Sequence, residues 1–328
     1  MSGIITTPTL RPDGTLLADP GHDPETELYL LPGFQIPPIP ESPTREQALK
    51  SLDLLNDLLC EFSFRQLKDG KVKSEVEKRL NRSVALSGLL TALVRGSLPT
   101  APLHLVRAHM AGTGKSHLVD TIAVVATGRI CPVITTLKSS EETEKRLGSI
   151  ILDGVPIISL DNCVHDLGGE LLCQIAERPV VKIRILGRSE TPDCEIHTAV
   201  FATGNNIGFR RDMFRRGLVC NLEALNERPE LREFKRNVLR QAAGNRATYV
   251  AAALTIMRAY LAAGSPKVCG PFGSYPEWSA MVRSPLVWLG EPDPITSVNM
   301  SQVEDPELAD LREWVNLWLK EYALDTPS

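Results

Sequence analysis

The chain of 328 residues lacks several features that mark specialised classes of protein. No apolar run reaches the roughly 20 residues that a membrane-spanning helix needs. Met1 to Leu10 has neither the charged segment nor the apolar core of a secretory leader. These absences predict a cytoplasmic protein with no membrane partner.

The cysteines and histidines of the chain also lack the regular spacing of a metal site or a disulfide framework. The seven cysteines include no C-x-x-C pair, and the six histidines are dispersed along the chain. Zinc sites and disulfide frameworks need regular spacings of these residues, so neither is expected. The rest of the composition, 43% hydrophobic and 23% charged, is typical of a globular protein.

The formal net charge of −4 is distributed unevenly. Both ends of the chain are acidic, whereas residues 207–246 are rich in arginine. A polyanion would therefore contact this protein locally. A solvated basic helix face is the alternative explanation for about half of these arginines.

The strongest pattern is a strand, a glycine-rich turn and a helix between Leu103 and Thr127. Leu103–Ala108 is predicted as a strand, and apolar residues at helical spacing before Gly128 predict a capped helix. The turn has the composition of a phosphate-binding loop, in which glycines let backbone N–H groups approach phosphates. We expect seven residues to bind the nucleotide: Ala111, Gly112, Thr113, Gly114, Lys115, Ser116 and His117.

Within this loop the expected cofactors are ATP and Mg²⁺. Lys115 should reach the β- and γ-phosphate oxygens, and the Ser116 hydroxyl should bind Mg²⁺. One position departs from the G-x-x-x-x-G-K-[ST] pattern, because this chain has His109 at the first glycine. Histidine adopts positive φ more readily than most residues, so the loop can still close.

Val155–Asp161 is predicted as a buried strand that ends in a carboxylate. An apolar strand that carries one acid to Mg²⁺ is typical of a Walker B motif, which makes Asp161 the second expected metal ligand. Pro132–Thr136 is a further strand between the two motif strands in sequence. This order favours ATPases that place an additional strand between the motifs over small nucleotide kinases.

Asn162 follows Asp161 at the position where related ATPases usually have a glutamate. An amide cannot take a proton from the attacking water. Either Asn162 positions water while another acid assists, or hydrolysis is slow. Glu141, Glu142 and Asp166 are the candidate acids, and each could equally be a surface or capping residue.

Two further segments follow the Walker B strand. Thr198–Thr203 is predicted as a buried strand that ends in Gly204-Asn205-Asn206. Asn205 at its tip can hold the lytic water or the γ-phosphate, the role called sensor 1, although these residues could form only a turn.

Between the Walker B strand and this strand, Val180–Leu186 and the turn after it predict a hairpin with a basic rim, for which a solvated edge strand is the alternative.

In this order the motifs resemble the helicase-like ATPase domain of phage and prophage primase–helicase proteins, and more widely AAA+ and superfamily-three helicases. The resemblance extends over most of the chain in short stretches. They are Thr9–Pro32, Glu141–Gly154, Leu160–Asn162, Ile185–Glu190, Ala202–Asn206, Asp212–Gly217, Asn245–Gly264, Trp278–Ser279 and Leu289–Pro294.

The resemblance implies an oligomeric ring, expected to be a hexamer, that hydrolyses ATP at subunit interfaces and pulls on single-stranded DNA. Lys182, Arg184 and Arg188 would then belong to a DNA-gripping pore hairpin. Arg215 or Arg216 would be an arginine finger that acts on the neighbouring subunit's nucleotide, whereas in a monomer both are surface charges. Relatives often carry a primase domain upstream, so this chain is either a fragment or the partner of a separate primase.

The fold class expected is α/β, a P-loop NTPase of AAA+-like type with a three-layer core and a parallel sheet. We expect an N-terminal hairpin and proline-rich connector at 1–40, a helical subdomain at 41–100 and the core at 101–225. A helical lid at 226–270 and a C-terminal helical tail at 271–328 complete the prediction. Thr44 and Gln47 predict a capping box, and Asp305 the start of a last helix. Arg246 in the lid could reach a phosphate, although a packed helix is the simpler interpretation.

Two functional hypotheses remain. The first is an ATP-driven DNA helicase or translocase in phage or mobile-element replication. The second is a nucleotide-gated DNA-binding loader or regulator with little turnover, which Asn162 favours. A small-molecule kinase is disfavoured by the strand order and by the Gly-Asn-Asn strand.

Overall fold

The computed structural model describes residues 3–66, 68–69, 72–73, 75–135, 140–185, 190–224, 235–298, 314–315 and 318. Arg188, the start of the predicted last helix at Asp305 and the side chain of Glu141 lie outside the described residues.

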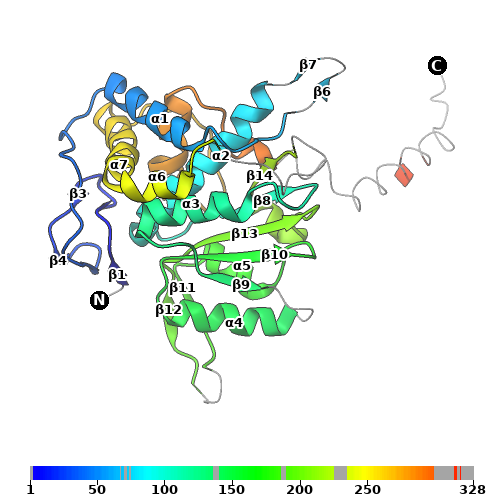
Figure 1. Ribbon diagram of the computed structural model, residues 1–328. Helices are drawn as coiled ribbons and strands as arrows, with labels where there is room; N and C mark the ends of the chain where they lie inside the picture. Colours follow the sequence, from blue (N-terminus) through cyan, green and yellow to red (C-terminus); the bar gives the residue numbers. More distant parts are fainter. Residues whose placement is uncertain are drawn as a thin grey trace, which may run out of the picture.

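A five-stranded parallel sheet forms the centre of the molecule (Figure 1). Its order is β14-β8-β13-β10-β9, so β13 lies between β8 and β10. The strands are β8 (Leu103–Ala108), β9 (Val133–Thr135), β10 (Ile157–Cys163), β13 (Ala199–Asn205) and β14 (Gly217–Leu222). The predicted α/β fold with a P-loop and a parallel sheet is confirmed. The strand between the two motif strands in the sheet is β13, whereas β9, the strand expected at Pro132–Thr136, lies at the sheet edge beside β10.

Alternating side chains of β8 divide the apolar interior into two clusters. Leu105 faces the cluster formed with α4 (Ser140–Leu152) and α5 (Glu170–Glu177), and Val106 faces the opposite one. The period of two in a strand explains why adjacent residues serve opposite faces. Helices therefore cover both faces of the sheet, as the three-layer prediction requires (Figure 1).

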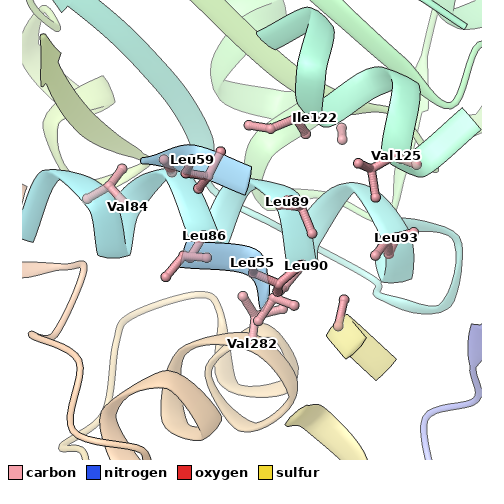
Figure 2. Packing of buried hydrophobic residues seen from close by; sticks show 14 of the residues in the cluster. Leu55, Leu59, Val84, Leu86, Leu89, Leu90, Leu93, Ile122, Val125 and Val282 are labelled. Atoms are coloured by element: carbon pink, nitrogen blue, oxygen red, sulfur yellow. The ribbon is translucent and has the colours of Figure 1, made fainter. Parts of the chain in front are cut away.

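The cluster on the Val106 side joins helices that come from distant parts of the sequence. Leu55, Leu89, Ile122 and Val282 all belong to it, and Figure 2 shows their side chains converging. The helices involved are α1 (Arg45–Leu59), α2 (Glu75–Val94), α3 (Lys115–Thr127), α6 (Val238–Gly244) and α7 (Arg246–Ala262). The segment 41–100 thus shares one apolar cluster with the core, and its assignment as a separate subdomain stays a prediction.

Local sequence signals set several element boundaries. The predicted capping box is confirmed, because the Thr44 side chain accepts from Gln47 N and the Gln47 side chain accepts from Thr44 N. Such a cap stabilises a helix by about 1 kcal/mol. The predicted N-terminal hairpin is also confirmed, with Gly14 at φ 86° in the turn between β2 (Thr9–Leu10) and β3 (Leu16–Leu17).

Short elements complete the described chain. They are β1 (Gly3–Ile5), β4 (Gly21–His22), β5 (Leu28–Leu30), β6 (Lys68–Asp69), β7 (Val72–Lys73), η1 (Arg95–Ser97), β11 (Val180–Lys182), β12 (Asp193–Glu195), η2 (Arg211–Arg215), α8 (Pro276–Trp278), η4 (Ser279–Arg283) and α9 (Ser284–Trp288). Trp278 is fully buried, and its indole N–H donates to Thr91 Oγ1 at 2.8 Å. Of the helices that the structure describes, none has the length and apolar character to cross a bilayer.

Candidate nucleotide site

The phosphate-binding loop lies between the end of β8 and the first turn of α3. Gly112 and Gly114 adopt φ values of 74° and 91°, which only glycine reaches at little cost. Gly114 O accepts from Leu118 N at 2.9 Å, so the helix begins directly after the loop. The first N–H groups of α3 and its positive end therefore face the loop, as anion binding requires.

His109 closes the loop by a side-chain contact instead of an unusual backbone conformation. Outside glycine, the described residues with positive φ are Glu27, Asn162, Asn206 and Ser265, so the loop closes without using the positive φ that histidine tolerates. His109 Nδ1 lies 2.7 Å from Asn206 Oδ1, and Asn206 Nδ2 donates to His109 O. The strained conformation lies at Asn206, at the tip of the neighbouring strand.

Lys115 and Asn205 meet above the carboxyl ends of the strands. Lys115 Nζ donates to Asn205 Oδ1 at 2.7 Å and to Met110 O at 3.2 Å. Partial burial lowers the pKa of Lys115, and the nearby Asp161 carboxylate opposes this shift. The structure thus brings the lysine and the predicted sensor amide together where a γ-phosphate would bind.

Ser116 and Asp161 form the second half of the site. Ser116 Oγ donates to Asp161 Oδ1 at 2.8 Å. Two neighbouring ligands of an octahedral Mg²⁺ lie about 3 Å apart, so this pair of oxygen atoms fits the ion. Within the described part of the chain, no group of three or more His, Cys, Asp and Glu side chains could hold a metal. Phosphate oxygens and water would have to complete the coordination.

Thr203 is a site residue that the sequence analysis missed. Its hydroxyl donates to Asp161 Oδ1 at 2.6 Å and accepts from Asn162 N at 3.1 Å. The sequence did contain a signal for this role, because Thr203 is a hydroxyl-bearing residue in an otherwise apolar strand, two positions before Asn205. Thr203 therefore fixes both the expected metal ligand and the residue that follows it.

Gly204 lies between Thr203 and Asn205, where no Cβ atom can be accommodated. A Cβ built there would lie 2.7 Å from Cys163 O and 2.4 Å from an Ile207 methyl group. The close approach of β13 to β10 requires glycine at this position.

Asn162 has φ 52° at an irregular point of β10. Two of the candidate acids, Asp166 and Glu142, have side chains that the structure describes. Asp166 Oδ1 accepts from Gly208 N at 2.7 Å, which ties Asp166 to the turn after β13, and Glu142 is exposed on α4. The assistance of either acid stays a prediction.

Arg215 and Arg216 lie at the opposite edge of the sheet, where β14 begins. Arg216 is 6% exposed, and its guanidinium donates to Glu177 Oε2 at 2.6 Å. The Arg215 side chain is 61% exposed, with Glu177 and Asp212 oxygen atoms at 3.7 and 3.6 Å. The finger role needs a second chain and stays a prediction, for which Arg215 is the more accessible of the two.

The predicted basic hairpin exists as β11 and β12, which pair antiparallel with Lys182 opposite Asp193. Lys182 and Arg184 are exposed, whereas the intervening Ile183 is buried. The hairpin lies below the sheet in Figure 1, beside α4. Two of the three predicted DNA-binding residues thus lie on one solvent-facing side, and their role stays a prediction.

Arg246 is too far from the loop to reach a phosphate within the same subunit. Its guanidinium donates to Val125 O at 3.0 Å and lies 3.8 Å above the Phe34 ring. These contacts are at the carboxyl end of α3, about 20 Å from the loop for a helix of this length. Arg246 neutralises the helix end instead. These contacts fit the packed-helix interpretation and not the alternative of a phosphate contact, and the description of 226–270 as a lid stays a prediction.

No family model matches the chain, and no curated protein matches it. Among solved structures it is similar to an apo structure of the NrS-1 C terminal region, with 14% identity and a TM-score of 0.37, covering 75% of this chain and 53% of that one. It is also similar to the JCV helicase, with 13% identity and a TM-score of 0.30, covering 75% and 67%. The chain thus spans about half the length of the NrS-1 chain.

Proposed function

We propose that the protein is a Mg²⁺-dependent ATPase. The observation that carries the proposal is the convergence of Lys115 with Asn205 and of Ser116 with Asp161 at one edge of the sheet. These four side chains come from three separate elements, and a chance glycine-rich turn would not assemble them. Ligands of open parallel sheets bind at this edge.

The loop amides and Lys115 would bind the phosphates, and Ser116 and Asp161 would hold the metal. When bound, Mg²⁺ supplies positive charge that neutralises the phosphate oxygens. Asn205 would contact the γ-phosphate or orient the attacking water. Phosphoryl transfer leaves a protein little covalent chemistry, so positioning and charge would lower the barrier.

Coupled to this reaction, we propose DNA translocation or unwinding by an oligomeric ring, a hexamer, in phage or mobile-element replication. The exposed Lys182 and Arg184 support a contact with single-stranded DNA. The exposed Arg215 supports a contact in trans with the nucleotide of the next subunit. A separate primase is the further partner proposed.

A nucleotide-gated DNA-binding protein with little turnover is the second candidate. The specific observation is Asn162, which stands beside Asp161 without the carboxylate that would accept a proton from water. In this candidate ATP binding alone would drive assembly.

The deciding experiment measures ATP turnover with and without single-stranded DNA, while light scattering follows the mass of the same sample. The motor predicts turnover that rises with DNA, a ring-sized mass with ATP and Mg²⁺, and loss of turnover in Lys115→Ala. Lys267→Ala is the matched control, because Lys267 is exposed on the loop after α7. Tight ATP binding without turnover decides for the second candidate. A monomer that binds no ATP rejects both.

A further inference from the structure

The turn that follows β13 is held from both sides. Asn206 N donates to Ala108 O at 3.0 Å on the side of the phosphate loop. On the other side, Gly208 N donates to Asp166 Oδ1 at 2.7 Å and Gly208 O accepts from Leu167 N. The position of Asn205 therefore depends on how firmly this turn is fixed.

Arg107 provides a third connection, through the carbonyl group between those two anchors. It lies on β8, paired with Gly204 of β13 and with Asn221 of β14. Arg107 Nη1 donates to Ile207 O at 3.1 Å, and Nε donates to Asn221 Oδ1 at 2.7 Å. One guanidinium thus links the carboxyl ends of both strands that flank β8.

Asn221 is itself fixed by a buried amide of α2. Asn81 is 1% exposed, and its Oδ1 accepts from Asn221 N at 2.8 Å and from Asn221 Nδ2 at 3.2 Å. Asn81 Nδ2 donates to Arg65 O and to Glu77 O. Because the oxygen and the nitrogen of the Asn81 side-chain amide both form hydrogen bonds, the orientation of this amide is determined. Asn221 Oδ1 is consequently left to accept from Arg107.

We infer that Arg107 is a positioning residue of the proposed ATPase, and this inference rests on that proposed function. Arg107 holds the turn after β13 so that Asn205 stays against Lys115, and Asn221 holds Arg107. The turn needs such support because Asn206 adopts φ 51°, a conformation that costs about 1 kcal/mol or more outside glycine. Arg107 reaches these two acceptors with two separate nitrogens, Nε and Nη1, whereas lysine would have to reach both from a single nitrogen, so we expect lysine to be a poor replacement.

Loss of Arg107 should displace the Asn205 amide without removing a contact to the nucleotide. The hydrogen bond from Asn206 N to Ala108 O and the Ser116–Asp161 pair do not involve Arg107, so we expect ATP to bind nearly as before. Catalysis should suffer, because a displacement of about 1 Å at a reacting group reduces rates by up to about a hundredfold.

The test compares Arg107→Lys and Asn221→Ser with Arg129→Lys, a control at the far end of α3. We expect kcat to fall between about tenfold and about a hundredfold in both test variants, with the affinity for a fluorescent ATP analogue within about twofold of wild type. The double variant should lose little more than Arg107→Lys, because the two residues act in series. Arg129→Lys should leave kcat and affinity unchanged.

The outcomes separate the inference from the function on which it rests. Wild-type turnover with an unchanged kcat in Arg107→Lys overturns the inference alone. Equal losses of kcat and ATP affinity also overturn it, because they indicate a collapsed site. A wild-type chain that binds but does not hydrolyse ATP overturns the proposed ATPase and the inference with it. If Arg107→Lys fails to fold, Asn221→Ser alone gives the result.

Discussion

Lys115 Nζ and Asn205 Oδ1 lie 2.7 Å apart, although 90 residues separate them in the chain. The contact joins the phosphate loop to the tip of β13 and leaves the lysine among oxygen atoms of the protein. A γ-phosphate would bring stronger acceptors to the same place. The pair therefore marks where the reacting phosphate is expected.

Replacing Asn205 with alanine should remove this contact and the proposed sensor. We expect kcat to fall by about a hundredfold to a thousandfold, as when one preorganised donor at a reacting centre is lost. ATP affinity should change little, since the loop amides remain. Steady-state kinetics and equilibrium binding measure the two effects. Asn245→Ala, an exposed site before α7, serves as the control, and an unchanged kcat in Asn205→Ala would reject the sensor role.

Thr203 should control the affinity for Mg²⁺ through Asp161. Thr203→Val removes the hydroxyl that donates to Asp161 Oδ1, and we expect half-maximal turnover to need about tenfold to a hundredfold more Mg²⁺. Thr203→Ser keeps a hydroxyl and should restore much of the affinity. A Mg²⁺ titration of the ATPase rate decides, and identical curves for valine and serine would contradict the role of the hydroxyl.

Arg216 and Arg215 should have different roles. We expect Arg216 to stabilise the fold and Arg215 to act between subunits. Arg216→Ala removes the closest partner of Glu177, which keeps Arg215 and Ser274, and we expect a loss of about 1.5 to 3 kcal/mol in the free energy of unfolding. Arg215→Ala, at an exposed site, should cost less than about 0.5 kcal/mol. Urea unfolding gives both values.

The finger hypothesis adds a kinetic difference for Arg215. Arg215→Ala should lower turnover in the assembled protein by about a thousandfold while its melting curve stays unchanged. Full turnover in that variant, in a sample of unchanged mass, would exclude Arg215 as the finger.

Acid should weaken the ion pair between Arg11 and Asp23, whose atoms Nη2 and Oδ1 lie 2.8 Å apart near the N-terminus. The Arg11 hydrogen bond, opposed by partial burial, lowers the pKa of Asp23 from 3.8 to about 2. Because the folded-state pKa is depressed, the stabilisation is complete above about pH 4 and disappears as the pH falls through 2. Its size is at most about 2 kcal/mol. Unfolding of wild type and Asp23→Asn should therefore differ at pH 6 and converge near pH 2, and a difference that grows with acidity would contradict this account.

Sequence patterns predicted best what is local. The strand Leu103–Ala108 and the Gly128 cap are found where the sequence placed them. Both depend on residues that lie close together in the sequence. The Thr44 cap has the same local origin. The parallel sheet followed from the alternation of strands and helices, whereas the order of the motifs did not show that β13, and not β9, lies between β8 and β10.

The contacts that shape the candidate site are not local. His109 with Asn206 and Arg107 with Asn221 are 97 and 114 residues apart. No periodicity records such pairs, so the sequence could not show that Asn206 instead of His109 takes the unusual φ. The same limit applies to Arg246, since the residues of α7, most of which are buried, do not reveal which end of α3 this helix meets.

The insertion of β13 between β8 and β10 also has a consequence for folding. The phosphate loop and the Asp161 strand are synthesised first, but they become neighbours of a common strand only when residues 199–205 enter the gap between them. These pairings close long stretches of chain, which makes them slow steps. A nucleotide that binds only the finished site would stabilise the chain only after this insertion, by mass action. Nucleotide binding should therefore slow the unfolding of the finished protein without speeding the earlier steps of folding.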